Sequence, residues 1–136
     1  MRVLLDTTVL IDIERNRPKA IAGIKALAKH ELCISTITAN EFFFGAALSS
    51  QPDALKNASA ILNQFRAVDV DMRVALAAAT LEAHFRSIGA PRNKGDFLIA
   101  ATAIVGNCDL LVTANKAHFT DIAALKGKVK DIGDCA

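Results

Sequence analysis

Short apolar runs alternate with amphipathic stretches along the whole chain, and this alternation restricts the fold more than any other feature. The first run, Val3-Leu4-Leu5, is uninterrupted, as expected for a strand that is buried on both faces. Helical spacing of apolar residues follows the runs. Strands that alternate with helices predict an α/β fold around a parallel sheet. We expect strands at residues 2–5, 32–35, 67–70 and 109–113, an edge strand near 128–132, and helices at 9–14, 18–28, 36–48, 52–65, 72–88 and 96–104.

The 136 residues are predicted to form one domain with a central, mostly parallel sheet of four to five strands flanked by helices. Apolar residues make up 52% of the chain, but no stretch reaches the roughly 18–20 uncharged residues that a membrane-spanning helix needs. Asp6 comes too early for a signal peptide. We therefore expect a soluble, cytoplasmic protein whose surplus apolar surface meets a partner chain.

The cysteines give no sign of a disulfide or zinc framework. Cys33, Cys108 and Cys135 are odd in number, widely spaced and contain no C-x-x-C pair. Reduced thiols are the simplest expectation. The histidines show no ligand spacing either, and the net charge of +2 is uninformative by itself.

Three acids lie next to apolar residues: Asp6 after the first run, Glu41 in a phenylalanine-rich segment, and Asp96 before another apolar run. A buried, unpaired carboxylate costs several kcal/mol, and a hard divalent cation with oxygen ligands compensates that cost. Parallel sheets collect ligands at the carboxyl ends of their strands. Each acid also has a simpler interpretation, because Asp6 and Asp96 can cap helices and Glu41 can be a solvated residue. The apolar helical neighbours of Glu41 favour a cleft over open solvent.

Asn115 follows the fourth predicted strand, at the same edge of the sheet as Asp6, although asparagine is also a common turn residue. Other acidic α/β folds fit the residues less well. A haloacid dehalogenase-type phosphatase needs a second Asp where this chain has Thr8, and a receiver domain needs an early acid pair that is missing. No G-x-G-x-x-G or P-loop motif supports nucleotide binding.

Four segments resemble the PIN-domain ribonucleases, and within them the VapC-type toxins of toxin–antitoxin pairs. They are residues 4–11 (LLDTTVLI), 35–41 (STITANE), 95–103 (GDFLIAATA) and 111–119 (LVTANKAHF). Each is weak alone, but the four together span almost the whole chain in the family's order. The resemblance implies one PIN-like domain over residues 1–136. It also implies an Mg²⁺- or Mn²⁺-dependent endoribonuclease, the toxin of a VapBC-type pair, which cuts RNA with metal-activated water.

By this resemblance, Asp6, Glu41 and Asp96 match the three acidic positions of the family, which implies that they are catalytic and bind the metal. Asn115 matches a fourth metal position, which is Asp in many members and Asn in others. The missing charge implies that a second ion is held more weakly or through water. Whether one or two ions bind, and whether Glu41 or Asp96 orients the attacking water, stays open.

Supporting and RNA-binding residues are expected around the acids. Thr113 matches a position where the family often has a hydroxyl, and Thr7 lies beside the first acid. RNA needs cations for its backbone, and Arg92, Lys94 and Lys116 all lie close in sequence to the site residues. Ordinary solvated charge is the alternative for each. Without Trp or Tyr, base stacking falls to Phe or Arg.

The resemblance also implies partner chains. Such toxins form homodimers or higher toxin–antitoxin assemblies, and a VapB-type antitoxin inserts its C-terminal segment into a groove near the active site. Phe42, Phe43 and Phe44 cannot all face one core from one helix, so we expect at least one to meet a partner. The rival interpretation is a catalytically weak or inactive PIN-like RNA-binding or scaffold domain, for which Asn115 is the only argument. A phosphatase is a more distant alternative.

Overall fold

The structure is a computed structural model that describes residues 1–136, and strands alternate with helices in it as the sequence predicts. The strands are β1 (Arg2–Leu5), β2 (Glu31–Ser35), β3 (Arg66–Val68), β4 (Leu110–Thr113) and β5 (Val129–Asp131). The helices are α1 (Thr7–Glu14), α2 (Pro18–Leu27), α3 (Thr36–Leu48), α4 (Ala54–Leu62), α5 (Met72–Ser87) and α6 (Lys94–Val105). Three short 3-10 turns follow β4 or flank β5: η1 (Lys116–His118), η2 (Ala123–Leu125) and η3 (Ile132–Asp134). None of the helices combines the length and the apolar character needed to cross a bilayer.

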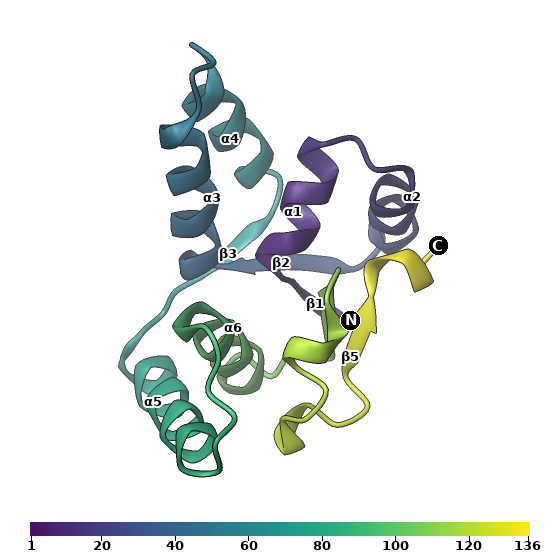
Figure 1. Ribbon diagram of the computed structural model, residues 1–136. Coiled ribbons are helices and arrows are strands. Elements are labelled where there is room, and N and C mark those ends of the chain that lie inside the picture. The colour runs from purple at the N-terminus through teal and green to yellow at the C-terminus, as the bar shows by residue number, and fades with distance from the viewer.

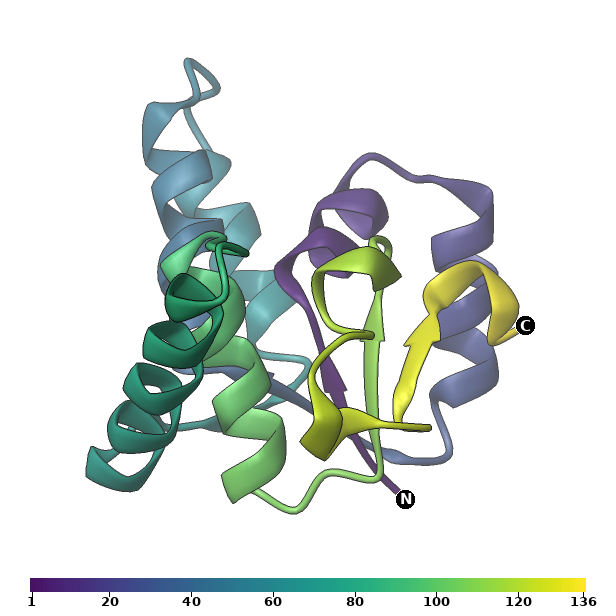
Figure 2. The same ribbon diagram turned by 60° about the horizontal axis from the view of Figure 1, so that its bottom comes forward.

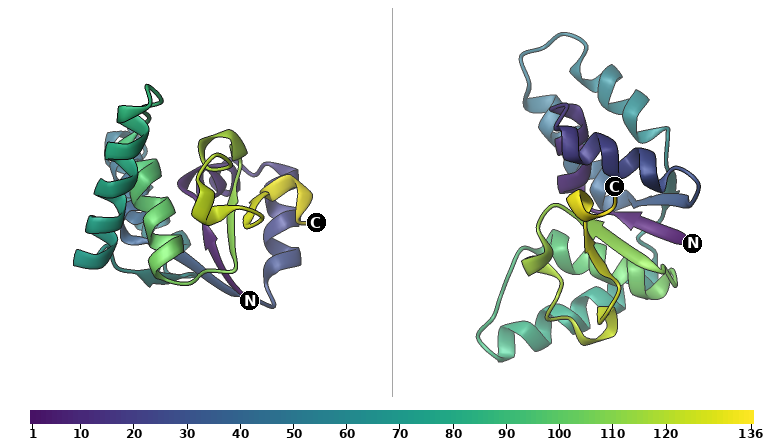
Figure 3. Two further views of the ribbon diagram at one scale, coloured as in Figure 1. Left: turned by 90° about the horizontal axis from the view of Figure 1, so that it is seen from below. Right: turned by 90° about the vertical axis from the view of Figure 1, so that its right-hand side faces the viewer.

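The strands form one sheet in the order β3-β2-β1-β4-β5, and every neighbouring pair is parallel. Helices α1 to α4 lie on one side of the sheet and α5 and α6 on the other, so the molecule has three layers (Figure 1; Figure 3, right). The α3–α4 hairpin extends beyond the rest of the fold (Figure 2). This architecture confirms the predicted α/β fold with a central parallel sheet.

Alternation along the central strands divides the core between the two faces of the sheet. Leu4 of β1 packs with the core under α5 and α6, whereas its neighbours Val3 and Leu5 pack with the core under α1 to α4. In β4, Leu111 and Val112 divide in the same way. All five side chains are fully buried, which explains why β1 and β4 read as continuous apolar runs.

Two predicted elements are shorter or shifted in the structure, and for the strand the reason is its pairing with a distant neighbour. The third strand, expected at 67–70, is Arg66–Val68 because it pairs with β2. Strand β2 ends at Ser35, where α3 begins, so Val68 is the last residue with a strand partner. The fourth helix is also shorter than the predicted 52–65, spanning Ala54–Leu62.

The start of α6 also differs from the prediction. We expected Asp96 to open this helix, but Asn93 caps it by accepting a hydrogen bond from the backbone N–H of Gly95 at 2.7 Å. Asp96 therefore lies inside the first helical turn, where the helix dipole favours a negative charge. The predicted end of α5 at Gly89 is confirmed, because this glycine has a φ of +76° just after the helix.

The cysteines are free thiols, as expected. Cys33 and Cys108 are both buried in the core under α5 and α6. Burial raises the pKa of the Cys108 thiol to about 11, because the apolar surroundings disfavour the thiolate. These side chains contribute to packing and are unsuited to nucleophilic chemistry at neutral pH.

Candidate active site

The strand order creates a natural site where β1 and β4 lie side by side. Strand β1 is central: β2 and β3 lie on one side of it in the sheet, and β4 and β5 lie on the other side. Ligands in such sheets bind at the carboxyl ends of the strands where the order reverses. Asp6 directly follows β1, and Thr113 ends β4. The backbone N–H of Asp6 donates to the Val112 carbonyl at 2.9 Å, which joins the two strand ends.

Asp6 is buried and held by three neutral donors. Its side chain caps α1 by accepting the Thr7 backbone N–H at Oδ1, at 2.8 Å. Its other oxygen, Oδ2, accepts the hydroxyls of Thr8 at 2.7 Å and Thr113 at 2.8 Å. The residue is 3% exposed, and none of the salt bridges of the structure includes it. A negative charge is therefore held in place without a counter-charge in contact, which is costly in isolation.

Glu41 reaches the same site from the middle of α3. Its Oε1 accepts the Thr7 hydroxyl at 2.7 Å, and the hydroxyl of buried Thr38 lies 3.1 Å from that of Thr7. Thr7 thus contacts two acids, donating its N–H to Asp6 and its O–H to Glu41. The other carboxylate oxygen packs against the first turn of α6, where a methyl group on Gly95 would lie 2.7 Å from Oε2.

Asp96 completes the group from the first turn of α6. Its Oδ2 lies 3.1 Å from Nδ1 of His118, and its side chain is 15% exposed. Burial raises the pKa of Asp96, and the charges of Asp6 and Glu41 raise it further, against a lowering effect of His118 and Arg92. The three predicted acids therefore lie within electrostatic reach of one another, although they come from three separate elements.

Asn115, which directly precedes η1, and His118, the last residue of η1, form the rim of the site. The Asn115 backbone N–H donates to the Thr113 hydroxyl at 2.9 Å, and its side-chain Nδ2 lies 2.9 Å from His118 Nε2. With Nδ2 donating to Nε2, the Nδ1–H of a neutral imidazole donates to Asp96. His118 therefore connects the third acid with the asparagine.

Sequence reasoning missed Thr8, Thr38, Gly95 and His118. Thr8 carried a local signal, because a hydroxyl two residues after an aspartate can bond to its carboxylate. His118 carried another, since it follows Asn115 by three residues, the spacing of one 3-10 turn. Thr38 and Gly95 carried none, because their roles depend on the packing of α3 against α1 and α6.

The predicted RNA-binding cations differ in their surroundings. Lys116 is exposed and forms no salt bridge. Lys94 pairs with Glu82 at 2.7 Å on the surface of the α5–α6 layer. Arg92 is bound within the protein, with both terminal nitrogens on Asp121. Of the three, Lys116 beside Asn115 is the cation that an incoming phosphate can reach without breaking an ion pair.

The donor set fits a hard divalent cation. Carboxylate, amide and hydroxyl oxygens surround the site, and these are the ligands of Mg²⁺ and Mn²⁺. The side chains do not form a closed cage, since no three His, Cys, Asp or Glu residues converge closely enough to surround an ion. The open arrangement agrees with Mg²⁺, which keeps several waters and binds through one or two carboxylates plus substrate phosphate.

Asp96 is expected to make the stability of the metal-free protein depend on pH. Its folded-state pKa is raised above the ordinary value of 3.8, so folding favours the protonated carboxyl. The resulting stability is present below the unfolded pKa and is lost as the pH rises through the raised pKa. We expect the free energy of unfolding in EDTA, measured with urea, to fall over this range. The fall should be smaller in Asp96→Asn, and identical pH profiles for both proteins would contradict this assignment.

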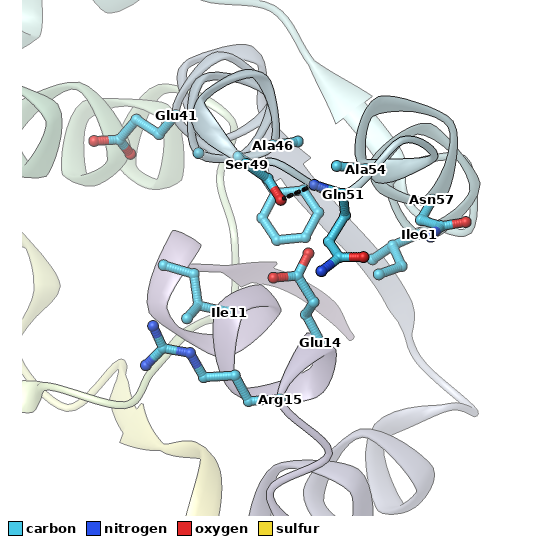
Figure 4. Close-up of a pocket in the computed structure, with 12 residues that line it drawn as sticks. Ile11, Glu14, Arg15, Glu41, Ala46, Ser49, Gln51, Ala54, Asn57 and Ile61 are labelled. Atoms are coloured by element: carbon cyan, nitrogen blue, oxygen red, sulfur yellow. Dashed lines mark hydrogen bonds between the residues drawn. The ribbon is translucent and has the colours of Figure 1, made fainter.

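A groove of about 380 Å³ runs from Glu41 between α1 and the α3–α4 hairpin (Figure 4). Its apolar wall includes Ile11, Phe42 and Ile61. Glu14 of α1 points across it toward Gln51 (Figure 4). The groove therefore has an apolar wall and carries both acidic side chains, Glu14 and Glu41, and one basic side chain, Arg15; it meets the acid site at Glu41.

A family model described as PIN domain matches residues 3–125. The chain belongs to the PIN domain family. The match confirms the resemblance on which the sequence prediction relied. Among the relatives of this PIN domain is the Shigella flexneri protein named tRNA(fMet)-specific endonuclease VapC, 25% identical over 127 residues that cover 93% of this chain and 96% of that protein.

Solved structures share the fold over nearly the whole chain. VapBC2 from Rickettsia felis, bound to a DNA fragment from its promoter, contains a chain that matches with a TM-score of 0.84 and 24% identity. This alignment covers 96% of the present chain and 98% of that one. VapBC-1 from nontypeable Haemophilus influenzae matches with a TM-score of 0.83 and 25% identity, covering 97% and 98%. The PIN fold of this chain is thus the one found in toxin–antitoxin complexes.

Proposed function

We propose that this PIN domain is a metal-dependent endoribonuclease, the VapC-type toxin of a VapBC toxin–antitoxin pair. The observation that carries the proposal is that Asp6, Glu41 and Asp96 come within electrostatic reach of one another at the junction of β1 and β4, and that no lysine or arginine pairs with any of them. Relatives named as VapC endonucleases and ribonucleases support the activity over almost the whole chain. The function expected from the sequence agrees with them.

The three acids are proposed to hold Mg²⁺ or Mn²⁺, with Asn115 as a weaker ligand that acts directly or through water. When bound, the metal supplies charge stabilisation at the phosphate and lowers the pKa of water. Both oxygens of Asp6 accept hydrogen bonds from threonines, so its orientation is fixed. This pre-organised acid is the anchor of the site, because its geometry needs no rearrangement when RNA arrives.

Glu41 and Asp96 each keep a carboxylate oxygen free for other partners. Oε2 of Glu41 and Oδ1 of Asp96 accept no hydrogen bond from the protein. Either oxygen is placed to accept the proton of a water molecule as that water attacks phosphorus and the P–O bond to the leaving group breaks. Lys116, exposed at the rim, is proposed to bind a neighbouring phosphate.

The first test is RNA cleavage with and without metal. Purified protein is incubated with transfer RNA and with a structured messenger RNA fragment, in Mg²⁺ or in EDTA, and fragments are resolved on a gel. We expect cleavage with Mg²⁺ and its loss in EDTA, restored by added Mn²⁺. Cleavage that persists in EDTA would contradict the metal mechanism. RNA binding without cleavage under all conditions would instead support the scaffold interpretation.

The groove beside Glu41 is proposed to receive the C-terminal segment of a VapB-type antitoxin. Its apolar wall complements apolar side chains of such a segment, and its two acids, Glu14 and Glu41, outnumber its one base, Arg15, which favours a segment that also carries basic side chains. A segment in this groove would block the approach of RNA to Glu41. The proposed antitoxin therefore inhibits by occupying the active-site side of α3.

Gly45 offers a direct test of this groove. It lines the groove on α3, and a Cβ atom added there meets no atom within 4 Å. We expect Gly45→Trp to fill the groove and weaken binding of the cognate antitoxin peptide roughly ten- to hundredfold, measured by calorimetry. Gly45→Ala is the matched control and should bind normally. Equal peptide affinity of the Trp variant and the wild type would exclude this groove.

A homodimer is proposed from the exposed apolar side chains of α3 and α5. Phe42 is 5% exposed, but Phe43 and Phe44 are 38% and 63% exposed, so the three phenylalanines do divide between core and surface. On α5, Met72 and Leu76 are 83% and 70% exposed. Such patches on a monomer favour a partner surface. Sedimentation equilibrium that shows only monomer would reject the homodimer.

A further inference from the structure

Arg92 lies in the loop between α5 and α6, where its guanidinium stacks on aromatic rings. Its central carbon is 4.4 Å from the centroid of the Phe85 ring and 5.7 Å from that of Phe97. Both rings are buried, and the Arg92 side chain is 16% exposed. Both distances are within the range of cation–π attraction, so the guanidinium is held against the aromatic core of the α5–α6 layer.

The same guanidinium also forms hydrogen bonds with the segment that carries His118. Nη1 donates to the His118 carbonyl at 2.9 Å and to Oδ1 of Asp121 at 2.7 Å, while Nη2 donates to Oδ2 of Asp121 at 2.6 Å. This fork-to-fork pair keeps the pKa of Asp121 below its usual value and raises that of Arg92. Residues 118 and 121 are thereby fixed to the loop that precedes α6.

The imidazole of His118 points to the acid site. His118 contacts Asp96 through Nδ1 and Asn115 through Nε2. A chain of contacts therefore runs from the aromatic rings through Arg92 and the His118 backbone to two residues of the proposed metal site. Lysine could not replace this arrangement, because a compact ammonium neither stacks flat nor binds a carboxylate with two parallel hydrogen bonds.

We propose that Arg92 is a positioning residue of the active site, which fixes η1 so that His118 holds Asp96 and Asn115 in place. The proposal rests on the ribonuclease function proposed above. It replaces the sequence-based expectation that Arg92 binds RNA, because both terminal nitrogens of the guanidinium are already bound inside the protein and the side chain is only 16% exposed. An RNA phosphate would have to compete with Asp121 for the same guanidinium.

Two variants weaken the Arg92–Asp121 pair, one from each partner: Arg92→Lys and Asp121→Asn. Arg86→Lys and Asp53→Asn are matched controls, since both residues are exposed and neither contacts the site. We expect both test variants to lower kcat for RNA cleavage about tenfold or more, with KM within about twofold of the wild type. The controls should retain wild-type values.

An RNA-binding Arg92 gives the opposite pattern. Arg92→Lys would then raise KM and reduce the salt dependence of RNA binding by about one phosphate contact. Asp121→Asn would tighten RNA binding by freeing the guanidinium. Either result would overturn the positioning role.

A readout without RNA separates this proposal from the proposed function. In protein labelled with ¹⁵N-histidine, the imidazole signals of His118 are assigned with a His118→Asn variant. We expect these signals to shift in Arg92→Lys and in Asp121→Asn, and to stay unchanged in the two controls. Unchanged signals in both test variants would overturn the proposal. If the signals shift but the wild type cleaves no RNA under any condition, the ribonuclease function is rejected, while the positioning of His118 by Arg92 is supported.

Discussion

An Asp6→Asn variant is expected to cleave RNA roughly 100 to 1,000 times more slowly than the wild type. The substitution keeps the shape of the side chain but removes the negative charge that anchors the proposed metal site. It also costs hydrogen bonds, because an amide NH₂ in place of one oxygen cannot accept the Thr7 N–H at Oδ1 or, in the other orientation, the hydroxyls of Thr8 and Thr113 at Oδ2. Initial rates on one RNA substrate at saturating Mg²⁺ measure the effect.

Loss of activity must be separated from loss of the fold. Asp53→Asn changes an exposed aspartate whose side chain makes no capping hydrogen bond, and this variant should cleave at the wild-type rate. The urea midpoint of Asp6→Asn should show a folded protein, since the lost hydrogen bond is partly offset by weaker repulsion of Asp96. A folded Asp6→Asn variant that cleaves normally would remove Asp6 from the mechanism.

Gly95→Ala is expected to reduce cleavage by roughly a hundredfold without unfolding the chain. The new methyl would lie 2.7 Å from Oε2 of Glu41, too close for the carboxylate to keep its position. The flexible end of Glu41 can move aside, so we expect the protein to stay folded but the Glu41 carboxylate to leave its position in the site. The methyl would also lie 3.2 Å from Oδ1 of Asn93, the cap of α6, and this close contact is offset by the helix propensity of alanine, which exceeds that of glycine by about 0.5–1 kcal/mol. Cleavage rate and urea midpoint are measured together.

Gly45→Ala is the matched control, because it makes the same change in a helix where the methyl meets no atom within 4 Å. It should gain similar stability and keep full activity. A second arm combines Gly95→Ala with Glu41→Asp, which shortens the acid by one methylene. We expect the double variant to be no less active than Glu41→Asp alone, because the methyl then has no carboxylate to displace. Full activity of Gly95→Ala, or a further loss in the double variant, would contradict the contact.

Local sequence signals predicted the fold, and together with the family resemblance they selected the three acids as candidates. The uninterrupted run before Asp6 identified β1, because a strand buried on both faces must be apolar throughout. Asp6 was identified at the end of that strand, and the structure shows that it caps α1 and also lies in the acid group. The two interpretations of this residue are therefore compatible. Glu41 was identified by the contrast between its charge and its apolar helical neighbours.

Long-range packing explains what the sequence could not predict. The end of β3 depends on where its partner β2 stops. Arg92 looked like a free cation beside an acid, since nothing nearby in sequence shows that Asp121, 29 residues later, binds it. The space that Gly95 leaves for Glu41 likewise arises only when α3 packs against α6.

The central claim is that the carboxylates of Asp6, Glu41 and Asp96 act together as one metal site. Calorimetric titration of Mn²⁺ into EDTA-treated, dialysed protein tests this claim without RNA. We expect saturable binding to the wild type and to Asp53→Asn, and at least about tenfold weaker binding to Asp6→Asn and to Asp96→Asn. Mn²⁺ affinities that are the same in all four proteins would contradict the claim.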